Sequence, residues 1–152
     1  MLYSNACSYT IRAMTRLALT RPKGYVLMSE LCDDDDLPRH FVAKLFQQLV
    51  RNGLLISAKG RGGGFALARP PDQITLYDII AAIDGTAVYD QCVLGMVTCD
   101  DDQPCPLHDG FKPVRAEIKQ FLLQTTLYGM SKALQRKQRA LGRQIPVPDR
   151  PS

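Results

Sequence analysis

The side chains most able to do chemistry are three cysteines and one histidine within seventeen positions of each other: Cys92, Cys99, Cys105 and His108. Thiolate and imidazole groups are the usual ligands of zinc and of iron–sulfur clusters. Because each ligand on a flexible loop can be aimed independently, four ligands on one segment can close around a metal. The spacing therefore predicts a metal site.

Other interpretations of these four residues stay open. They suit structural zinc chemically, although their intervals differ from the close cysteine pairs of zinc knuckles. A metal-free thiol switch needs only two of the cysteines, and the thiols could also be inert. Cys7 and Cys32 lie outside the segment, and we expect them to be small buried hydrophobic side chains.

Charge is distributed unevenly along the 152 residues. Residues 1–85 carry ten Lys and Arg against eight acidic residues, and residues 111–152 carry nine against two. Between them, residues 86–110 carry five aspartates and neither Lys nor Arg. The basic ends and the net charge of +4 are consistent with nucleic acid as a partner.

The sequence indicates a cytoplasmic protein with no membrane partner. No stretch approaches the ~20 consecutive apolar residues that a membrane-spanning helix requires, and residues 1–5 lack the basic start of a secretion signal. The cytoplasm is reducing, so five cysteines there indicate metal ligands or redox thiols rather than disulfides. The length suits one ordinary core, or a small domain with an appendage.

The sequence predicts three short helices in its first 53 residues, ahead of the cysteine-rich segment. Apolar side chains recur at helical spacing over residues 9–19, and a second helix begins near Ser29. A third helix starts at Pro38 and ends at Gly53. Another helix opens at residues 75–78, just before the cysteine-rich segment.

A β-hairpin follows the third helix. Residues 54–58 and 65–68 are typical of strands, and the glycine-rich residues 59–64 form the turn between them. Three short helices followed by a hairpin with a basic tip predict a winged helix-turn-helix.

One long helix is predicted from Pro113 to Ala140, interrupted only by Gly129. At about 1.5 Å per residue it would be about 42 Å long, which overshoots a domain built from residues 1–85. Its apolar residues alternate steps of three and four: Leu123, Leu127, Met130, Leu134 and Leu141. Although Lys137 breaks this stripe, we interpret it as a homodimer surface rather than as core.

Several of these segments together resemble one family. The chain resembles a family of bacterial winged-helix regulators in four features. These are residues 9–14, Leu45-Phe46 ahead of residues 51–54, the wing at 60–67, and a cysteine loop before a long helix. That family includes the iron–sulfur regulator IscR and the nitric-oxide sensor NsrR. The resemblance covers residues 1–140. It implies a homodimer that binds palindromic operators in double-stranded DNA and whose cluster state alters that binding.

The resemblance also implies a ligand set. Three cysteine ligands fall on Cys92, Cys99 and Cys105, and in the IscR branch a histidine after the third cysteine, here His108, completes a [2Fe-2S] cluster. In NsrR-like members an acidic residue near the first helix can complete a [4Fe-4S] cluster. Ser8 occupies that position here, so [2Fe-2S] is favoured over [4Fe-4S]. The first cysteine interval holds six residues where the family usually has five, and the second holds five.

In a winged helix the third helix enters the major groove, and the wing follows the backbone or the minor groove. The candidate DNA-binding residues are polar residues of these two elements: Arg39, His40, Lys44, Gln47, Lys59 and Arg61. Ala43 stands where IscR-like proteins can carry a base-contacting glutamate, so the operator need not be theirs. We expect the aspartates at 33–36 to favour the helix dipole and to aid solubility.

The expected fold class is mainly α with a small β-hairpin wing: a winged helix-turn-helix domain plus a long dimerisation helix. Residues 1–85 would bind DNA, 86–110 would form the cluster-binding loop, 111–141 the dimerisation helix and 142–152 a disordered tail.

The leading hypothesis is a homodimeric, DNA-binding transcriptional regulator that senses redox state, iron or nitric oxide through a cluster held by the Cys-Cys-Cys-His loop. Within the same fold, a metal-free thiol switch or structural zinc is the alternative. From another class, a ferredoxin-like electron carrier would need neither recognition helix nor wing. An enzyme is not expected, because no nucleophile is paired with a base and residues 60–64 lack the ending of a phosphate-binding loop.

Overall fold

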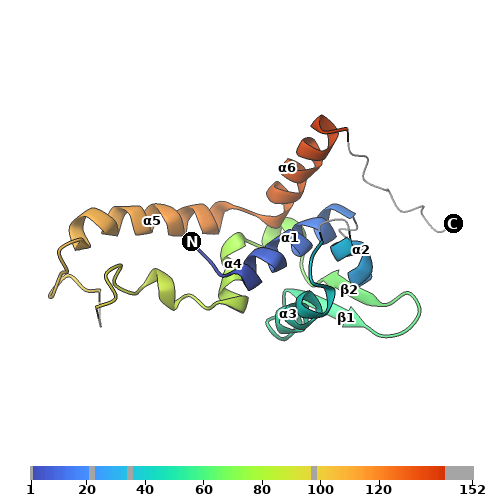
Figure 1. The fold of residues 1–152 in the computed structure, drawn as a ribbon, viewed down its shortest axis with the longest axis horizontal. Coiled ribbons are helices and arrows are strands. Elements are labelled where there is room, and N and C mark those ends of the chain that lie inside the picture. Colours follow the sequence, from blue (N-terminus) through green and yellow to red (C-terminus); the bar gives the residue numbers. More distant parts are fainter. Residues whose placement is uncertain (1, 21–22, 34–35, 97–98, 143–152) are drawn as a thin grey trace.

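A computed structural model describes residues 2–20, 23–33, 36–96 and 99–142 of the chain. The elements follow in the order α1 (Asn5–Thr20), α2 (Met28–Cys32), α3 (Arg39–Arg51), β1 (Leu55–Ala58), β2 (Gly64–Leu67), η2 (Pro71–Gln73), α4 (Leu76–Ile83), η3 (Ala87–Tyr89), α5 (His108–Gln124) and α6 (Leu127–Ala140). Figure 1 shows the hairpin at one end of the molecule and the cysteine loop, with the start of α5, at the other. The predicted fold class is confirmed.

The apolar faces of α1 and α3 and the hairpin form the main core. Met14, Leu17, Phe46 and Leu49 are fully buried in it. The rings of Phe46 and Phe65 meet edge to face, with their centroids 5.2 Å apart. Burying side chains of this size contributes about 1.5–3 kcal/mol each, so apolar packing alone gives the winged-helix region a strong core.

One glycine of the hairpin is required by a backbone contact that the sequence alone did not reveal. β1 and β2 pair antiparallel, with Leu55 opposite Leu67, and Val26 extends this sheet through two backbone hydrogen bonds with Phe65. Gly64 has φ +125°, and a Cβ there would collide with the carbonyl oxygen of Val26. Glycine at this position is therefore required by packing within the chain.

A second, smaller core lies between α4 and α5. Cys7, Ile80, Tyr89 and Leu122 are its buried centre, and the Tyr89 hydroxyl donates a hydrogen bond to the carbonyl oxygen of Leu2 over 2.9 Å. Cys7 is fully buried here, and Cys32 is buried in the main core. The prediction that both cysteines are small buried hydrophobic side chains is confirmed.

The predicted single helix from Pro113 to Ala140 is wrong. α5 begins earlier, at His108, and ends at Gln124, and α6 begins at Leu127. Part of the cause is local: Thr126 caps α6 by accepting a hydrogen bond from the Gly129 N–H over 3.1 Å.

The link between the two helices is extended backbone. Thr125 accepts a hydrogen bond from the Leu76 N–H, and the Leu127 N–H donates to Ile74, each over 2.8 Å. Beyond this link, α6 leaves at an angle to α5 (Figure 1) and packs on α1. Two backbone hydrogen bonds therefore hold the bend between α5 and α6.

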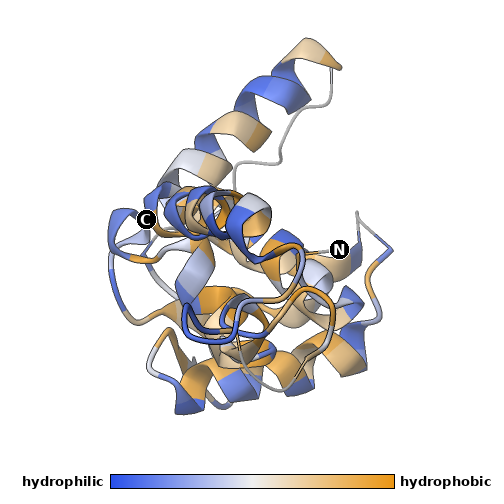
Figure 2. Cartoon of the chain, turned by 90° about the vertical axis from the view of Figure 1, so that its left-hand side faces the viewer, coloured by the Kyte–Doolittle hydropathy of each residue, from blue (hydrophilic) through white to orange (hydrophobic). Residues whose placement is uncertain are grey.

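The bend divides the predicted leucine stripe between different surroundings. Leu127 is fully buried in the chain's own core, and Met130 packs against that core. Leu123 and Leu141 are 46% and 61% exposed. Figure 2 shows α6 rising from the body with hydrophilic and hydrophobic residues mixed along its ribbon. The stripe is therefore not one continuous dimer surface.

Two further expectations concern the C-terminal tail and membrane-spanning helices. Of the predicted tail 142–152, residues 143–152 lie outside the described residues. Among the helices that are described, none combines the length and apolar content needed to cross a membrane.

Candidate metal centre and nucleic-acid interface

The cysteine loop connects η3 to α5 and places the four predicted ligands near the start of that helix. Cys92, Cys105 and His108 are buried, and Cys99 is half-buried. His108 is the first residue of α5, and its backbone N–H donates to the carbonyl oxygen of Cys105 over 2.9 Å. The first turn of α5 thus fixes the position of His108 relative to Cys105.

The four candidates come together as two pairs. Cys99 Sγ lies 3.3 Å from Nδ1 of His108, and Cys92 and Cys105 lie close enough for each side chain to shift the pKa of the other. Within the part of the chain that the structure describes, no three Cys, His, Asp or Glu side chains are close enough together to hold one metal ion.

The paired cysteines differ in acidity. Backbone hydrogen bonds from Leu94 and Met96 lower the pKa of Cys92, and the side chain of Cys105 and the charge of Arg115 act in the same direction. Burial raises the pKa of Cys105. The loop therefore favours the thiolate form at Cys92 rather than at its partner.

Asp101 and Lys112 form a polar contact around His108. Nε2 of His108 lies 2.8 Å from Asp101 Oδ1. Lys112 Nζ donates to both oxygens of Asp101, over 2.6 and 2.9 Å. The hydrogen bond from Lys112, followed by the one from His108, lowers the pKa of Asp101. These contacts keep Asp101 ionised beside the histidine.

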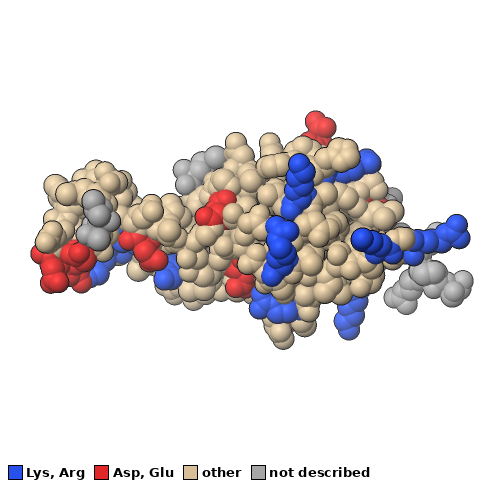
Figure 3. Space-filling model, turned by 90° about the horizontal axis from the view of Figure 1, so that it is seen from below, with Lys and Arg blue, Asp and Glu red and all other residues tan. Residues whose placement is uncertain are grey.

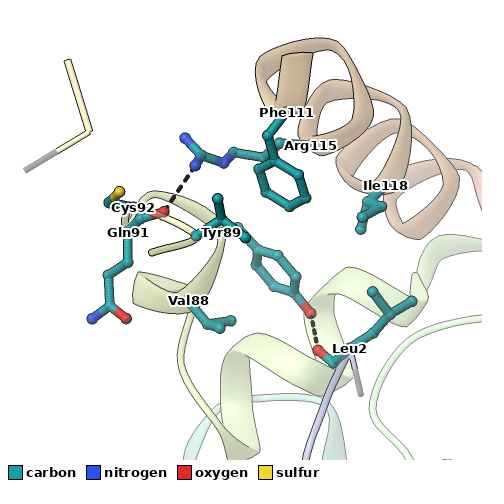
Figure 4. A pocket seen from close by; sticks show the side chains of 9 residues that line it. Leu2, Val88, Tyr89, Gln91, Cys92, Phe111, Arg115 and Ile118 are labelled. Atoms are coloured by element: carbon teal, nitrogen blue, oxygen red, sulfur yellow. Dashed lines mark hydrogen bonds between the residues drawn. The ribbon is translucent and has the colours of Figure 1, made fainter. Parts of the chain in front are cut away.

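Arg115 contacts the loop from the same face of α5. Nη1 donates to Cys99 Sγ over 3.3 Å, and Nη2 donates to the carbonyl oxygen of Gln91 over 2.8 Å. The guanidinium lies over the Phe111 ring, 5.5 Å from its centroid. Figure 4 shows Arg115, Phe111 and Gln91 at a pocket that is lined mainly by apolar residues. The volume of this pocket is about 290 Å³. A cation thus reaches a cysteine segment that has no Lys or Arg of its own.

The sequence interpretation missed Asp101, Lys112 and Arg115 as site residues. The signal was present, because Lys112 and Arg115 follow His108 by four and seven positions and therefore share its helix face. It was overlooked because the helix was expected to begin at Pro113 rather than at His108.

The six candidate DNA-binding residues are all exposed, on α3 and on the turn between β1 and β2: Arg39, His40, Lys44, Gln47, Lys59 and Arg61. Figure 3 shows Lys and Arg side chains over the half of the molecule that holds α3 and the wing, while acidic side chains gather at the end with the cysteine loop. The face that would meet phosphates is therefore the basic one.

Asp33 contacts Arg39 rather than capping α3. The two side chains form an ion pair at 2.6 Å, and the N-cap of α3 is Pro38, which makes no side-chain capping bond. Asp34 and Asp35 lie outside the described residues. On its inner side α3 is tied to α4, because Gln48 Nε2 donates to the carbonyl oxygen of Ala82 over 2.8 Å.

Comparison with known proteins points to one family. Residues 3–133 match the Rrf2 family, described as an iron-dependent transcriptional regulator. A "Putative HTH-type transcriptional regulator" of Aquifex aeolicus is 34% identical over 129 residues, which cover 84% of this chain and 89% of the relative. The HTH-type transcriptional regulator IscR of Sodalis glossinidius is 30% identical over 119 residues, covering 78% of this chain and 72% of the relative.

Solved structures show the same fold. CymR, the global cysteine regulator of B. subtilis, superposes with a TM-score of 0.72 at 26% identity and covers 86% of this chain and 95% of its own. IscR of T. potens gives a TM-score of 0.69 at 24% identity and covers 89% of both chains. The relatives are regulators rather than enzymes, and this chain belongs to the Rrf2 family of winged-helix, DNA-binding transcriptional regulators.

Proposed function

We propose that this chain is a cytoplasmic, homodimeric regulator that binds a palindromic operator and senses redox state, iron or nitric oxide through a [2Fe-2S] cluster. The cluster would be held by Cys92, Cys99, Cys105 and His108. The observation that carries the proposal is their arrangement as two pairs. A [2Fe-2S] cluster takes two protein ligands on each iron, whereas one zinc ion draws four ligands to a single point. The donor set therefore fits a two-iron cluster.

The cluster, when bound, would supply a group that changes with oxidants, nitric oxide or iron supply. The chain's own contacts connect the loop to the DNA-binding part. Arg115 joins Cys99 to Gln91, and Tyr89 packs in the core shared by α4 and α5. From α4, the hydrogen bond to Gln48 reaches α3. A shift of the loop would pass along this route to the recognition helix.

Metal analysis tests the cluster directly. Protein purified without oxygen should contain two irons and two sulfides per chain, as [2Fe-2S] requires, and absorb visible light. Cys99→Ala should remove the absorbance, whereas Cys32→Ala, which removes a thiol outside the loop, should retain it. A colourless zinc protein would overturn the cluster and leave DNA binding standing, and a metal-free protein with a loop disulfide would indicate a thiol switch. Cysteine variants that bind the operator like the parent in every redox state would exclude sensing through this loop.

The dimer is proposed to form through the outward face of α5. Leu107, the N-cap of α5, is followed at seven-residue steps by Val114 and Phe121 within the helix, and these side chains are 49%, 44% and 55% exposed. Within its own chain α5 packs mainly against α4, which leaves this apolar row uncovered. A seven-residue apolar repeat suits packing against the same helix of a second copy.

Sedimentation velocity tests this surface. Phe121→Glu should convert the dimer to a monomer, because the charge would be buried without a partner. Gln120→Glu adds the same charge at a neighbouring exposed position of α5 and should leave the dimer intact. A dimer that persists in Phe121→Glu at micromolar concentration would contradict an interface through this row.

DNA recognition is assigned to α3 and the wing. Arg39, His40, Lys44 and Gln47 would reach base edges and phosphates in the major groove, and Lys59 and Arg61 would follow the backbone or the minor groove. An operator selected from random DNA allows fluorescence anisotropy at several salt concentrations. Lys59→Ala should weaken binding to all sequences and reduce the salt slope by about one, whereas Gln47→Ala should relax specificity at one base pair. A ferredoxin-like carrier would select no sequence at all.

A further inference from the structure

His108 uses both of its ring nitrogens, and each faces a different partner. Nδ1 lies 3.3 Å from Cys99 Sγ, and Nε2 lies 2.8 Å from Asp101 Oδ1. An ionised carboxylate can only accept a hydrogen bond, so Nε2 carries the hydrogen of the neutral ring. The lone pair then lies on Nδ1 and points toward the cysteine. The side chain of Asp101 therefore selects one tautomer of His108.

Asp101 is held in place by the helix that carries His108. Lys112, one helical turn after His108, donates to both carboxylate oxygens. The preceding residue closes a turn, because Asp100 Oδ1 accepts the N–H groups of Asp102 and Gln103 over 3.1 and 2.7 Å. Side-chain and backbone contacts together fix the carboxylate beside the imidazole.

We propose that Asp101, held by Lys112, is the positioning residue of the cluster site: it keeps the hydrogen of His108 on Nε2, so that Nδ1 is the ligand atom. This inference rests on the proposed function. Histidine ligands usually donate their second N–H to an acceptor such as a carboxylate, and loss of that partner weakens metal binding about 10–100-fold.

A purely structural role for the contact is a weak alternative. The side chain of Asp101 is 72% exposed and that of Lys112 59%, and exposed ion pairs contribute little to folding. The imidazole is 5% exposed, so its orientation matters inside the site rather than at the surface. Removing Asp101 should therefore leave the fold intact and change the state of His108.

The first test needs no cluster. Long-range ¹H–¹⁵N NMR of the reduced, metal-free protein at neutral pH should show the Nε2–H tautomer for His108. Asp101→Ala should convert it to a mixture of tautomers, and Asp101→Glu should restore the single form. Asp102→Ala removes a neighbouring charge and should have no effect. An unchanged tautomer in Asp101→Ala, or an Nδ1–H form in the parent, would overturn the proposal.

The second test uses the cluster-loaded protein. With an iron chelator present, Asp101→Ala and Lys112→Met should lose their visible absorbance about tenfold faster than the parent, whereas Asp102→Ala should match the parent. Asp101→Ala with the parent's rate and spectrum would overturn this inference and leave the proposed function intact. A parent protein that binds neither iron nor sulfide would overturn the proposed function as well.

Discussion

The two ends of the molecule are stabilised by different forces. Around α3 and the hairpin, large apolar side chains such as Phe46 and Leu49 are completely buried. Around the start of α5 the contacts are polar, made by Asp101, Lys112 and Arg115 with the cysteine loop. Apolar burial is strong and non-directional, whereas each hydrogen bond contributes only about 0.5–1.5 kcal/mol net.

This difference indicates that the two ends suit different roles. The DNA-binding end needs no ligand to hold its core together. The loop depends on a few directional contacts that a change of chemistry at the cysteines can rearrange at small cost. The proposed function needs both properties, and the following predictions test whether the two ends differ in this way.

The largest effect is expected for two leucines that the sequence placed on one stripe. Leu127→Ala should lower the free energy of unfolding by about 2–5 kcal/mol, because the side chain is fully buried. Leu123→Ala, at an exposed position, should change it by less than about 0.5 kcal/mol. Urea unfolding followed by circular dichroism measures both. Equal losses would mean that the stripe acts as one surface.

Replacing a glycine by alanine should change the stability of the protein in opposite directions at the two ends. Gly64→Ala should destabilise the protein by about 1–3 kcal/mol, because φ is +125° and the added methyl meets the Val26 carbonyl. Gly110→Ala, inside α5 with open space around it, should stabilise by about 0.5–1 kcal/mol. Melting temperatures provide the measurement, and a stabilised Gly64→Ala would contradict the hairpin geometry.

Cys7 in the smaller core and Cys92 in the cysteine loop also have pKa shifts of opposite direction. Burial, then the charge of Asp84, raises the pKa of Cys7 from 9.0 to about 12, whereas that of Cys92 is lowered. Above pH 9 the unfolded chain loses the Cys7 proton and the folded chain keeps it, so stability should fall by about 1.4 kcal/mol per pH unit. The decrease should continue toward pH 12.

Urea unfolding at pH 9 and pH 10 tests this dependence. Cys7→Ala should lack the contribution of this thiol, so its stability should decline less steeply than that of the parent. The same decline in both proteins would show that the Cys7 thiol is not protected from ionisation.

The smallest effect is expected at the link between α5 and α6. Thr126→Val removes the side-chain cap of α6 and should cost about 1 kcal/mol. Thr125→Val removes a hydroxyl that donates to the Phe121 carbonyl within the last turn of α5, and should cost less than about 0.5 kcal/mol. Thermal unfolding of the pair should rank them in this order, and the reverse order would argue against a capped break.

Local patterns predicted the winged-helix end well. Apolar spacing on α1 and α3, and a glycine turn between two strands, each have a direct physical meaning in one short segment. Cys7 and Cys32 were also placed correctly, because an isolated cysteine away from other ligands packs as a small hydrophobic side chain.

The break between α5 and α6 depends mainly on contacts between distant segments, and these have no short-range signature. The break at Thr125 is stabilised by hydrogen bonds to residues 74–76, far away in the sequence. With the helix expected to begin at Pro113, the cations facing His108 were missed. The cluster ligands and DNA contacts remain predictions, to be tested as described above.

The extended link at Thr125 and Thr126 has a consequence for operator length. Its hydrogen bonds to Ile74 and Leu76 fix the direction in which α5 leaves the winged-helix body. In a dimer formed through α5, that direction sets the separation between the two α3 helices. Successive major-groove half-sites are about 34 Å apart. In the proposed dimer, this link would then determine the preferred spacing of half-sites, independently of the side chains proposed to contact the bases.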